Sequence, residues 1–155
     1  MCTVSIIGFG DASNAQASSS PGIRIVCNRD EQHDRAASLP PEIRRFGERR
    51  VILPIDSASG GTWMAVNDRG LCAGLLNVNP MQRHHPTSTI RSRGTIVPAI
   101  MHCADVSGAL SIARKFNAAE FQPFRLIVLD LRAVGQVSSI GSDSLTTDYT
   151  AWRGV

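Results

Sequence analysis

Short apolar runs alternate with turn signals along most of this chain, which predicts a protein built mainly of strands. The first two runs, residues 3–9 and 23–27, are apolar and rich in β-branched side chains. The segment between them is polar, rich in Ser and Gly, and ends in the turn signal Pro21-Gly22. Two runs joined in this way favour an antiparallel hairpin. We therefore expect Cys2 to lie beside residues 28–30, although they are far apart in the sequence.

A second hairpin is predicted in the middle of the chain. Residues 62–67 and 71–78 flank the triplet Asp68-Arg69-Gly70, where glycine can supply the positive φ that a tight turn needs. Upstream, Pro40-Pro41 breaks the chain. We expect the arginine-rich stretch that follows it to form a helical turn before the apolar segment VILPID.

Helical spacing replaces strand-like alternation after residue 94. Residues 94–103 are expected to be helical, and Asp105 is a candidate N-cap for a second helix that runs through Phe116. Residues 125–131 then predict a buried strand that pairs with residues 135–140. The order is strands, two helices, strands, so we expect one α+β domain over residues 1–155. Its sheets should be mostly antiparallel, with the helices on one outer face.

The composition is that of a soluble globular domain and argues against nucleic-acid binding. The chain has 155 residues, a net charge of +3, 43% hydrophobic residues and only 5% aromatic residues. Such a low aromatic content leaves few side chains on which bases could stack. An arginine cluster at residues 44–50 is interrupted or flanked by Glu42, Glu48 and Asp56, which favours a solvated surface over a phosphate-binding one.

Cysteine and histidine spacing predicts a reduced protein without a metal or another cofactor. The four cysteines are isolated, and the start of the chain lacks the basic region of a secretion signal. No apolar run approaches the length of a membrane span. We therefore expect a cytoplasmic protein. His33, His84, His85 and His102 lack zinc-site spacing.

Cys2 raises the question of catalysis, because removal of Met1 would leave it with both a thiol and a free amine. An α-amine has a pKa of about 8, so part of it is the free base near neutral pH and can accept the thiol proton. Nucleophile and base would then belong to one residue. Asp30 could orient the ammonium form, and Arg29 could lower the thiol pKa or bind a carboxylate. The alternatives are an incidental small residue at position 2 and an ordinary surface ion pair.

Several sequence blocks occur in the order typical of one family. They are MC at the start, CNRDE at 27–31, GGTW at 60–63, VNDRGLCAGLLN at 66–77, SRG at 92–94 and FRLIVLDL at 124–131. This series resembles the NRDE family, which includes the eukaryotic transport and Golgi organisation protein 2. More remotely it is similar to the cysteine N-terminal nucleophile (Ntn) hydrolases, such as bile salt hydrolases and penicillin V acylases.

The resemblance implies an αββα sandwich of two antiparallel sheets between helical layers, and it implies roles for several residues. Cys2 would be the nucleophile, Arg29 and Asp30 the activating pair, and Asn77 an oxyanion donor. Asn79 is the alternative donor, because it lies on the same face of the strand if alternation is regular. The candidate substrate-binding residues are Asn28, Glu31, Trp63 and Asn79, although Trp63 fits the core equally well.

The leading hypothesis is an amidohydrolase that cleaves a small linear, non-peptide C–N amide bond through an acyl-enzyme. One alternative is a non-catalytic binding or trafficking protein on the same scaffold, since part of the eukaryotic branch is linked to haem or lipid handling. Another is an inactive paralogue, because members of the family continue beyond the FRLIVLDL strand and this chain is expected to be truncated. The expected partner is a small-molecule amide or a hydrophobic ligand. The sequence does not determine whether the chain forms homo-oligomers.

Overall fold

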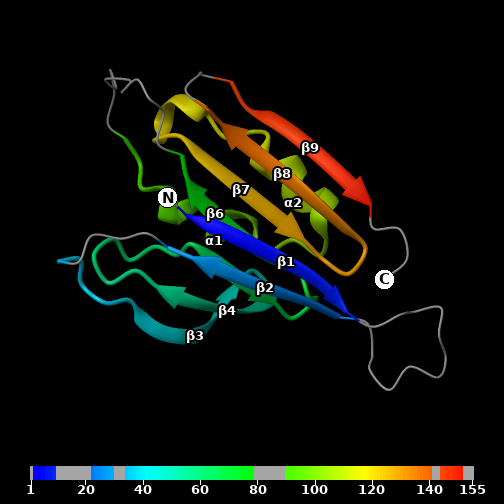
Figure 1. The fold of residues 1–155 in the computed structure, drawn as a ribbon, viewed down its shortest axis with the longest axis horizontal. Coiled ribbons are helices and arrows are strands. Elements are labelled where there is room, and N and C mark those ends of the chain that lie inside the picture. The colour runs from blue at the N-terminus through cyan, green and yellow to red at the C-terminus, as the bar shows by residue number, and fades with distance from the viewer. Residues whose placement is uncertain (1, 10–21, 30–33, 79–89, 141–143, 152–155) are drawn as a thin grey trace.

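The chain folds into two antiparallel sheets and a small helical layer (Figure 1). The computed structural model describes residues 2–9, 22–29, 34–78, 90–140 and 144–151. In this part of the chain, β1 and β2 form one sheet and β3–β9 form the other. Both the α+β class and the predominance of antiparallel pairing are confirmed.

The N-terminal hairpin forms as the sequence predicts. Strand β1 (Thr3–Phe9) pairs antiparallel with β2 (Gly22–Asn28), from Thr3 opposite Asn28 to Phe9 opposite Gly22. Half-buried and exposed residues alternate along both strands, so one face of the hairpin is turned toward the rest of the molecule. Val4 belongs to that face: one of its methyl groups lies 3.8 Å from the place where a Cβ on Gly74 would stand.

The second sheet is a meander in which each strand pairs with the next one in the sequence. Its strands are β3 (Leu39–Phe46), β4 (Arg49–Ile55), β5 (Met64–Asn67), β6 (Cys72–Asn77), β7 (Phe124–Leu129), β8 (Ala133–Ser139) and β9 (Thr146–Ala151). The predicted hairpin around Asp68-Arg69-Gly70 is therefore confirmed, and Gly70 has the expected positive φ of 77°. The pairing of β7 with β8 is confirmed as well.

The helical turn expected after Pro40-Pro41 is wrong, because that stretch is the edge strand β3. The two prolines are tolerated because an edge strand needs fewer backbone donors, and the register shifts between Leu39 and Glu42. Gly47, with a φ of 59°, starts a two-residue loop that returns the chain into β4. Alternating Val51, Leu53 and Ile55 on β4 then enter the core.

The two helices lie between β6 and β7 in the sequence and are shorter than predicted. A 3-10 turn, Arg93–Thr95, leads into α1 (Ile96–Ile100), and α2 spans Val106–Ala113. Asp105 is the N-cap of α2, as predicted, and its side chain accepts a hydrogen bond from the Gly108 N–H. Helix α2 ends before Phe116 because the last turn tightens, with Phe116 N–H donating to the Ala113 carbonyl.

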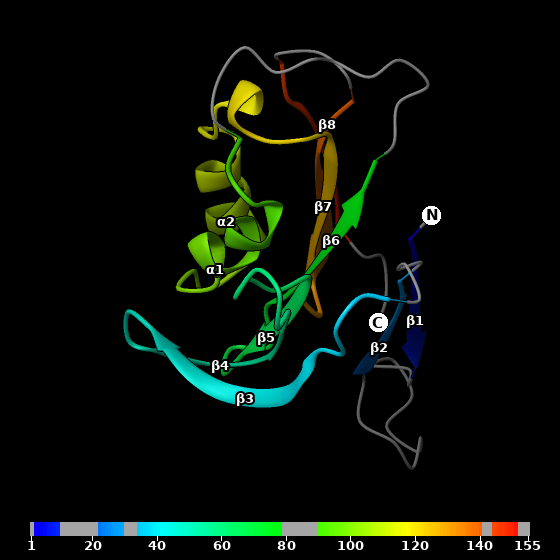
Figure 2. The same ribbon diagram turned by 90° about the vertical axis from the view of Figure 1, so that its left-hand side faces the viewer.

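These elements form three layers, with the seven-stranded sheet between the helices and the β1–β2 hairpin (Figure 2). The core fills the space between helices and sheet and includes Val97, Ile100, Leu110, Phe124 and Leu126, each at most 2% exposed. On the other side, the hairpin forms a separate layer (Figure 2), and β1 lies against β6, where Val4 contacts the site of Gly74. No helix in the described part of the chain is long and apolar enough to cross a membrane.

Candidate functional site

The hairpin register brings Cys2 and Arg29 to the same end of the two-stranded sheet. Thr3 opposite Asn28 is the last pair, so Cys2 and Arg29 follow directly on the two strands. Both are half-buried, whereas Thr3 and Asn28 are exposed, so alternation turns Cys2 and Arg29 toward the larger sheet. The expected neighbourhood of Cys2 and Arg29 is thus present. Asp30 lies outside the described residues.

Cys2 and Arg29 line a cavity of about 140 Å³. Much of the wall comes from four of the family-like blocks, which are far apart in the sequence: NRDE, GGTW, AGLLN and SRG. The lining residues are Cys2, Arg29, Arg35, Asp56, Ser59, Thr62, Trp63, Leu75, Asn77, Ser92, Arg93 and Gly94. Residues between positions 2 and 94 of the sequence therefore meet around one cavity.

Arg29 is held on two sides by residues of the segment that connects β4 to β5. Its guanidinium lies over the Trp63 ring, 4.0 Å from the ring centroid, a cation–π geometry. Its Nη2 atom is also 3.4 Å from Asp56 Oδ2. The arginine is thereby fixed in orientation beside Cys2, and the hairpin is tied to the larger sheet at this end.

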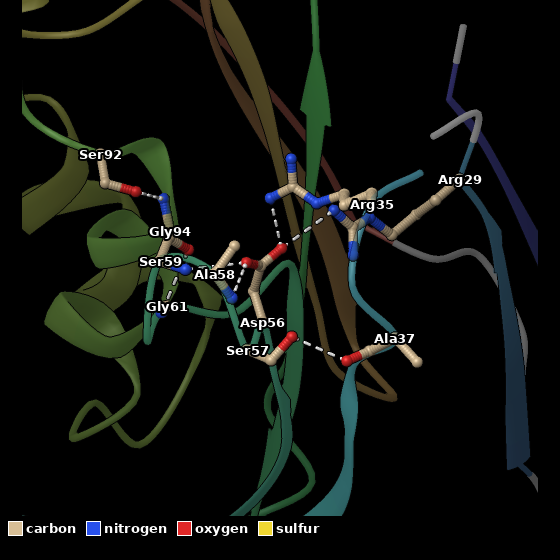
Figure 3. A network of polar contacts seen from close by, with 10 residues as sticks. All are labelled: Arg29, Arg35, Ala37, Asp56, Ser57, Ala58, Ser59, Gly61, Ser92 and Gly94. Carbon is tan, nitrogen blue, oxygen red and sulfur yellow. Dashed lines mark hydrogen bonds and ion pairs between the residues drawn. The ribbon is translucent and has the colours of Figure 1, made fainter. Parts of the chain in front are cut away.

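Asp56 anchors the polar network of the cavity (Figure 3). Its Oδ2 accepts a 2.7 Å hydrogen bond from Arg35, and its Oδ1 accepts from the backbone N–H groups of Ala58 and Ser59 at 3.1 and 3.0 Å. Burial alone would raise the pKa of this carboxyl. The hydrogen bonds from Arg35 and Ser59 and the charge of Arg35 outweigh burial and lower the pKa to about 2. Asp56 is therefore a carboxylate at neutral pH.

Two glycines allow the GGTW and SRG segments to touch. A Cβ on Gly61 would stand 2.7 Å from the Gly94 Cα, closer than real Cβ atoms approach other backbone. The Thr62 N–H donates to the Gly94 carbonyl at 3.1 Å across this contact. Trp63 lies two residues after Gly61, Arg93 directly precedes Gly94, and both line the cavity. The backbone contact therefore fixes the spacing of this part of the wall.

Asn77 lies at the end of β6, opposite Phe124, and lines the same cavity as Cys2. Nearby, Arg93 donates from Nη1 to the Pro123 carbonyl at 2.8 Å. This contact ties the segment before α1 to the start of β7. The cavity wall thus includes an amide group from β6 and a guanidinium from the SRG block as well as the thiol.

The remaining predicted residues are placed as follows. Trp63 is half-buried in the cavity wall, in contact with Arg29. Asn28 is exposed and is not among the lining residues. Glu31 and Asn79, like Asp30, fall outside the described residues. The proposed roles of all these residues stay predictions.

Cys2 is distinguished from the other cysteines by its position. All four cysteines are described and free, and of these only Cys2 lines the cavity. Burial and, to a smaller extent, the nearby Cys2 raise the pKa of the Cys27 thiol, although the positive charge of Arg29 acts to lower it. Burial and the charge of Asp130 raise the pKa of Cys72 to about 11, and burial with Asp105 raises that of Cys103. These three thiols are therefore poor nucleophiles at neutral pH.

Sequence reasoning missed part of the cavity wall, above all Asp56, which it placed on a solvated surface. The structure corrects this: Asp56 is 6% exposed and binds Arg29 and Arg35. The signal was an aspartate that ends an apolar strand and precedes a Ser- and Gly-rich turn. Other lining residues that were not predicted are Arg35, Ser59, Thr62, Leu75, Ser92, Arg93 and Gly94.

Among the residues that the structure describes, metal-binding side chains do not gather around this cavity. Within the described ranges, no group of three or more His, Cys, Asp and Glu side chains is arranged to hold a metal ion. His33, His84 and His85 lie outside those ranges. The chemistry that the described site can offer is thus a thiol, guanidinium groups, a carboxylate and an amide.

Comparison with known proteins identifies the family. A search among curated proteins found no match. The family model described as Transport and Golgi organisation 2 matches residues 14–152, which is most of the chain and includes every block quoted above except the start. The match covers Arg29, Trp63, Asn77 and Arg93, whereas Cys2 precedes it. The chain belongs to the Transport and Golgi organisation 2 family, the family of the Asn-Arg-Asp-Glu motif.

Proposed function

We propose that this protein is an amidohydrolase that uses Cys2 as an N-terminal nucleophile on a small linear, non-peptide amide. One observation carries the proposal. Of the four cysteines, Cys2 alone lines the cavity where the family blocks meet. The raised pKa values of Cys27, Cys72 and Cys103 leave it as the best candidate nucleophile. The cavity volume of about 140 Å³ suits a small acyl group.

The proposed reaction has two steps. The free α-amine of Cys2 accepts the thiol proton, and the sulfur attacks the carbonyl carbon of the amide. The tetrahedral intermediate then expels the amine, which takes the proton from the α-ammonium as the C–N bond breaks. Water attacks the resulting thioester with help from the same amine. The products are a carboxylic acid and the regenerated thiol.

The cavity residues are assigned supporting roles. Arg29, fixed by Trp63 and Asp56, places a positive charge in the cavity wall beside Cys2, where it can stabilise the negative charge that develops during the attack. Asn77 is proposed to donate from its amide to the oxyanion, since such a donor acts where negative charge develops. Asp30 is proposed to orient the α-ammonium group. In this arrangement the base is part of the nucleophile itself, so the site needs no histidine.

The test is release of the amine from a panel of small linear acyl amides. We expect Cys2→Ala to abolish release, and Cys2→Ser to reduce it severely because a hydroxyl is far less acidic than a thiol. Cys72→Ser is the matched control, because Cys72 does not line the cavity, and it should retain activity. If no amide is cleaved by the wild type, or if Cys2→Ala retains activity, the hydrolase proposal fails.

The same variants separate the enzyme from a non-catalytic binding protein. In a binding protein, Cys2→Ala would leave ligand retention unchanged, whereas Arg29→Ala would weaken retention of an anionic ligand. Arg24→Ala is the control, since Arg24 lies on the same strand but is exposed. Loss of retention in Arg29→Ala alone, with no amide turnover in the wild type, would support the binding protein.

A further inference from the structure

A polar cross-strand pair lies among apolar residues of the larger sheet. Arg125 on β7 lies directly opposite Ser138 on β8. Their neighbours Phe124, Leu126 and Val137 are fully buried in the core beneath the helices. Because side chains alternate along a strand, Arg125 and Ser138 belong to the opposite face of the sheet, which is turned toward the β1–β2 hairpin.

Both residues of this pair carry a buried donor without a partner. Arg125 Nε and Ser138 Oγ are shielded from solvent, and neither makes a hydrogen bond. Ser138 is only 1% exposed. Within the described part of the chain, no carboxylate pairs with the Arg125 guanidinium. Leaving a buried polar group unsatisfied costs free energy, about 1–3 kcal/mol for a typical group, so such groups call for an explanation.

The position of the pair connects it to the candidate active site. On the strand next to β7, Leu76 of β6 pairs with Arg125. Leu76 lies two residues beyond Gly74, which faces Val4 of the hairpin. Cys2 lies two residues before Val4, on the same face of the hairpin. In both ribbon views the start of β1 lies near the end of β6 and the start of β7 (Figures 1 and 2). Arg125 therefore lies at the end of the sandwich where Cys2 lies.

We propose that Arg125 and Ser138 bind a carboxylate group of the amide substrate. This inference rests on the proposed function and names the substrate class: a small amide that also carries a carboxylate. The chemistry fits, because the guanidinium offers parallel N–H donors that match a carboxylate, and the adjacent hydroxyl adds a third donor. Directly opposite residues in a sheet have Cβ atoms about 5 Å apart, so one carboxylate can reach both.

The first test measures binding without turnover. Saturable thermal stabilisation of the full chain by benzoate is compared with that by benzamide, its neutral counterpart, at constant ionic strength. We expect stabilisation by benzoate only, and an apparent Kd at least about tenfold weaker in Arg125→Met, as expected for a lost charge-assisted bond. Arg24→Met, on the exposed face of β2, is the control and should bind benzoate like the wild type.

Ser138→Ala distinguishes a binding role from a structural one. Its hydroxyl makes no hydrogen bond, so the substitution should leave the urea midpoint unchanged or raise it while it weakens benzoate binding about fivefold. If Arg125→Met does not fold, Arg125→Lys takes its place, because it keeps the charge but loses the planar donor pair. Unchanged benzoate binding in Ser138→Ala and in the folded Arg125 variant would overturn the proposal.

Turnover separates this inference from the proposed function. Among hydrolysed amides, those with a carboxylate should have a lower KM than their methyl esters, and Arg125→Met should erase this preference. If Cys2→Ala abolishes turnover but the preference is absent in the wild type, the carboxylate site fails while the hydrolase stands. If benzoate binding depends on Arg125 and Ser138 but no amide is cleaved, the hydrolase fails while the carboxylate site stands.

Discussion

The guanidinium of Arg29 lies over the indole ring of Trp63, 4.0 Å from the ring centroid. One residue belongs to the NRDE block and the other to the GGTW block, so this contact joins the two-stranded sheet to the larger one. It also fixes the cation that lies beside Cys2 in the cavity wall. Family blocks that are separate in the sequence are thus linked by a direct physical contact.

The first prediction concerns the energy of this contact. A double-mutant cycle with Arg29→Met and Trp63→Leu should give a coupling of about 1 kcal/mol in the free energy of unfolding, typical of a cation–π pair that is partly shielded from water. Urea denaturation of the four proteins measures it. Additive effects of the two substitutions would contradict an energetic contact between the residues.

The second prediction uses the low pKa of Asp56. A carboxyl group whose folded pKa is about 2, against an ordinary 3.8, stabilises the fold above pH 3.8, and this contribution is lost as the pH falls toward 2. At neutral pH, Asp56→Asn should therefore be less stable by about 2 kcal/mol.

Urea denaturation between pH 7 and pH 2 tests the pH window. The stability difference between wild type and Asp56→Asn should be constant above about pH 4 and should shrink below it. Asp148→Asn, at an exposed position on β9, is the control and should follow the wild type. A difference that persists unchanged to pH 2 would show that Asp56 does not stabilise the fold through its charge.

Much of the fold could be predicted because alternation and turn signals are local. The two hairpins, the N-cap Asp105 and the pairing of β7 with β8 all follow from nearby residues. Strand β3 could not be predicted in this way, because its prolines and arginines are tolerated only at a sheet edge. Strand β9 gives no strong apolar signal, since most of its residues are exposed.

The cavity could be predicted only in part. Cys2, Arg29, Trp63 and Asn77 belong to blocks that stand out in the sequence. Asp56 did not stand out, because its role depends on two arginines that reach it from segments more than twenty residues away. Such long-range pairing is a property of the packing of the sheets, and no local pattern encodes it.

The third prediction concerns the close approach of Gly61 to Gly94. Gly61→Ala should destabilise the protein by about 2 kcal/mol, because the new methyl group would meet rigid backbone at 2.7 Å. Gly74→Ala is the matched control, since its Cβ would make only an ordinary 3.8 Å contact with Val4. Urea midpoints of both variants provide the comparison, and equal stability of the two would argue against a tight backbone contact.

The fourth prediction concerns thiol reactivity. Under native conditions at neutral pH, iodoacetamide should modify Cys2 faster than the other cysteines. Burial raises the pKa of Cys27, Cys72 and Cys103, and therefore keeps them protonated. Time-resolved peptide mapping gives the rate at each site. Comparable rates at all four cysteines would favour a binding protein over an enzyme.

The most direct measurement is the mass of the N-terminal peptide after the protein has been mixed with a cleavable amide and quenched in acid. The account predicts a chain that begins at Cys2, with Met1 removed, and that carries the acyl group of the amide as a thioester on Cys2. The adduct should be absent in Cys2→Ala and present in Cys72→Ser. A retained Met1, or an acyl group found only on another cysteine, would contradict the N-terminal nucleophile.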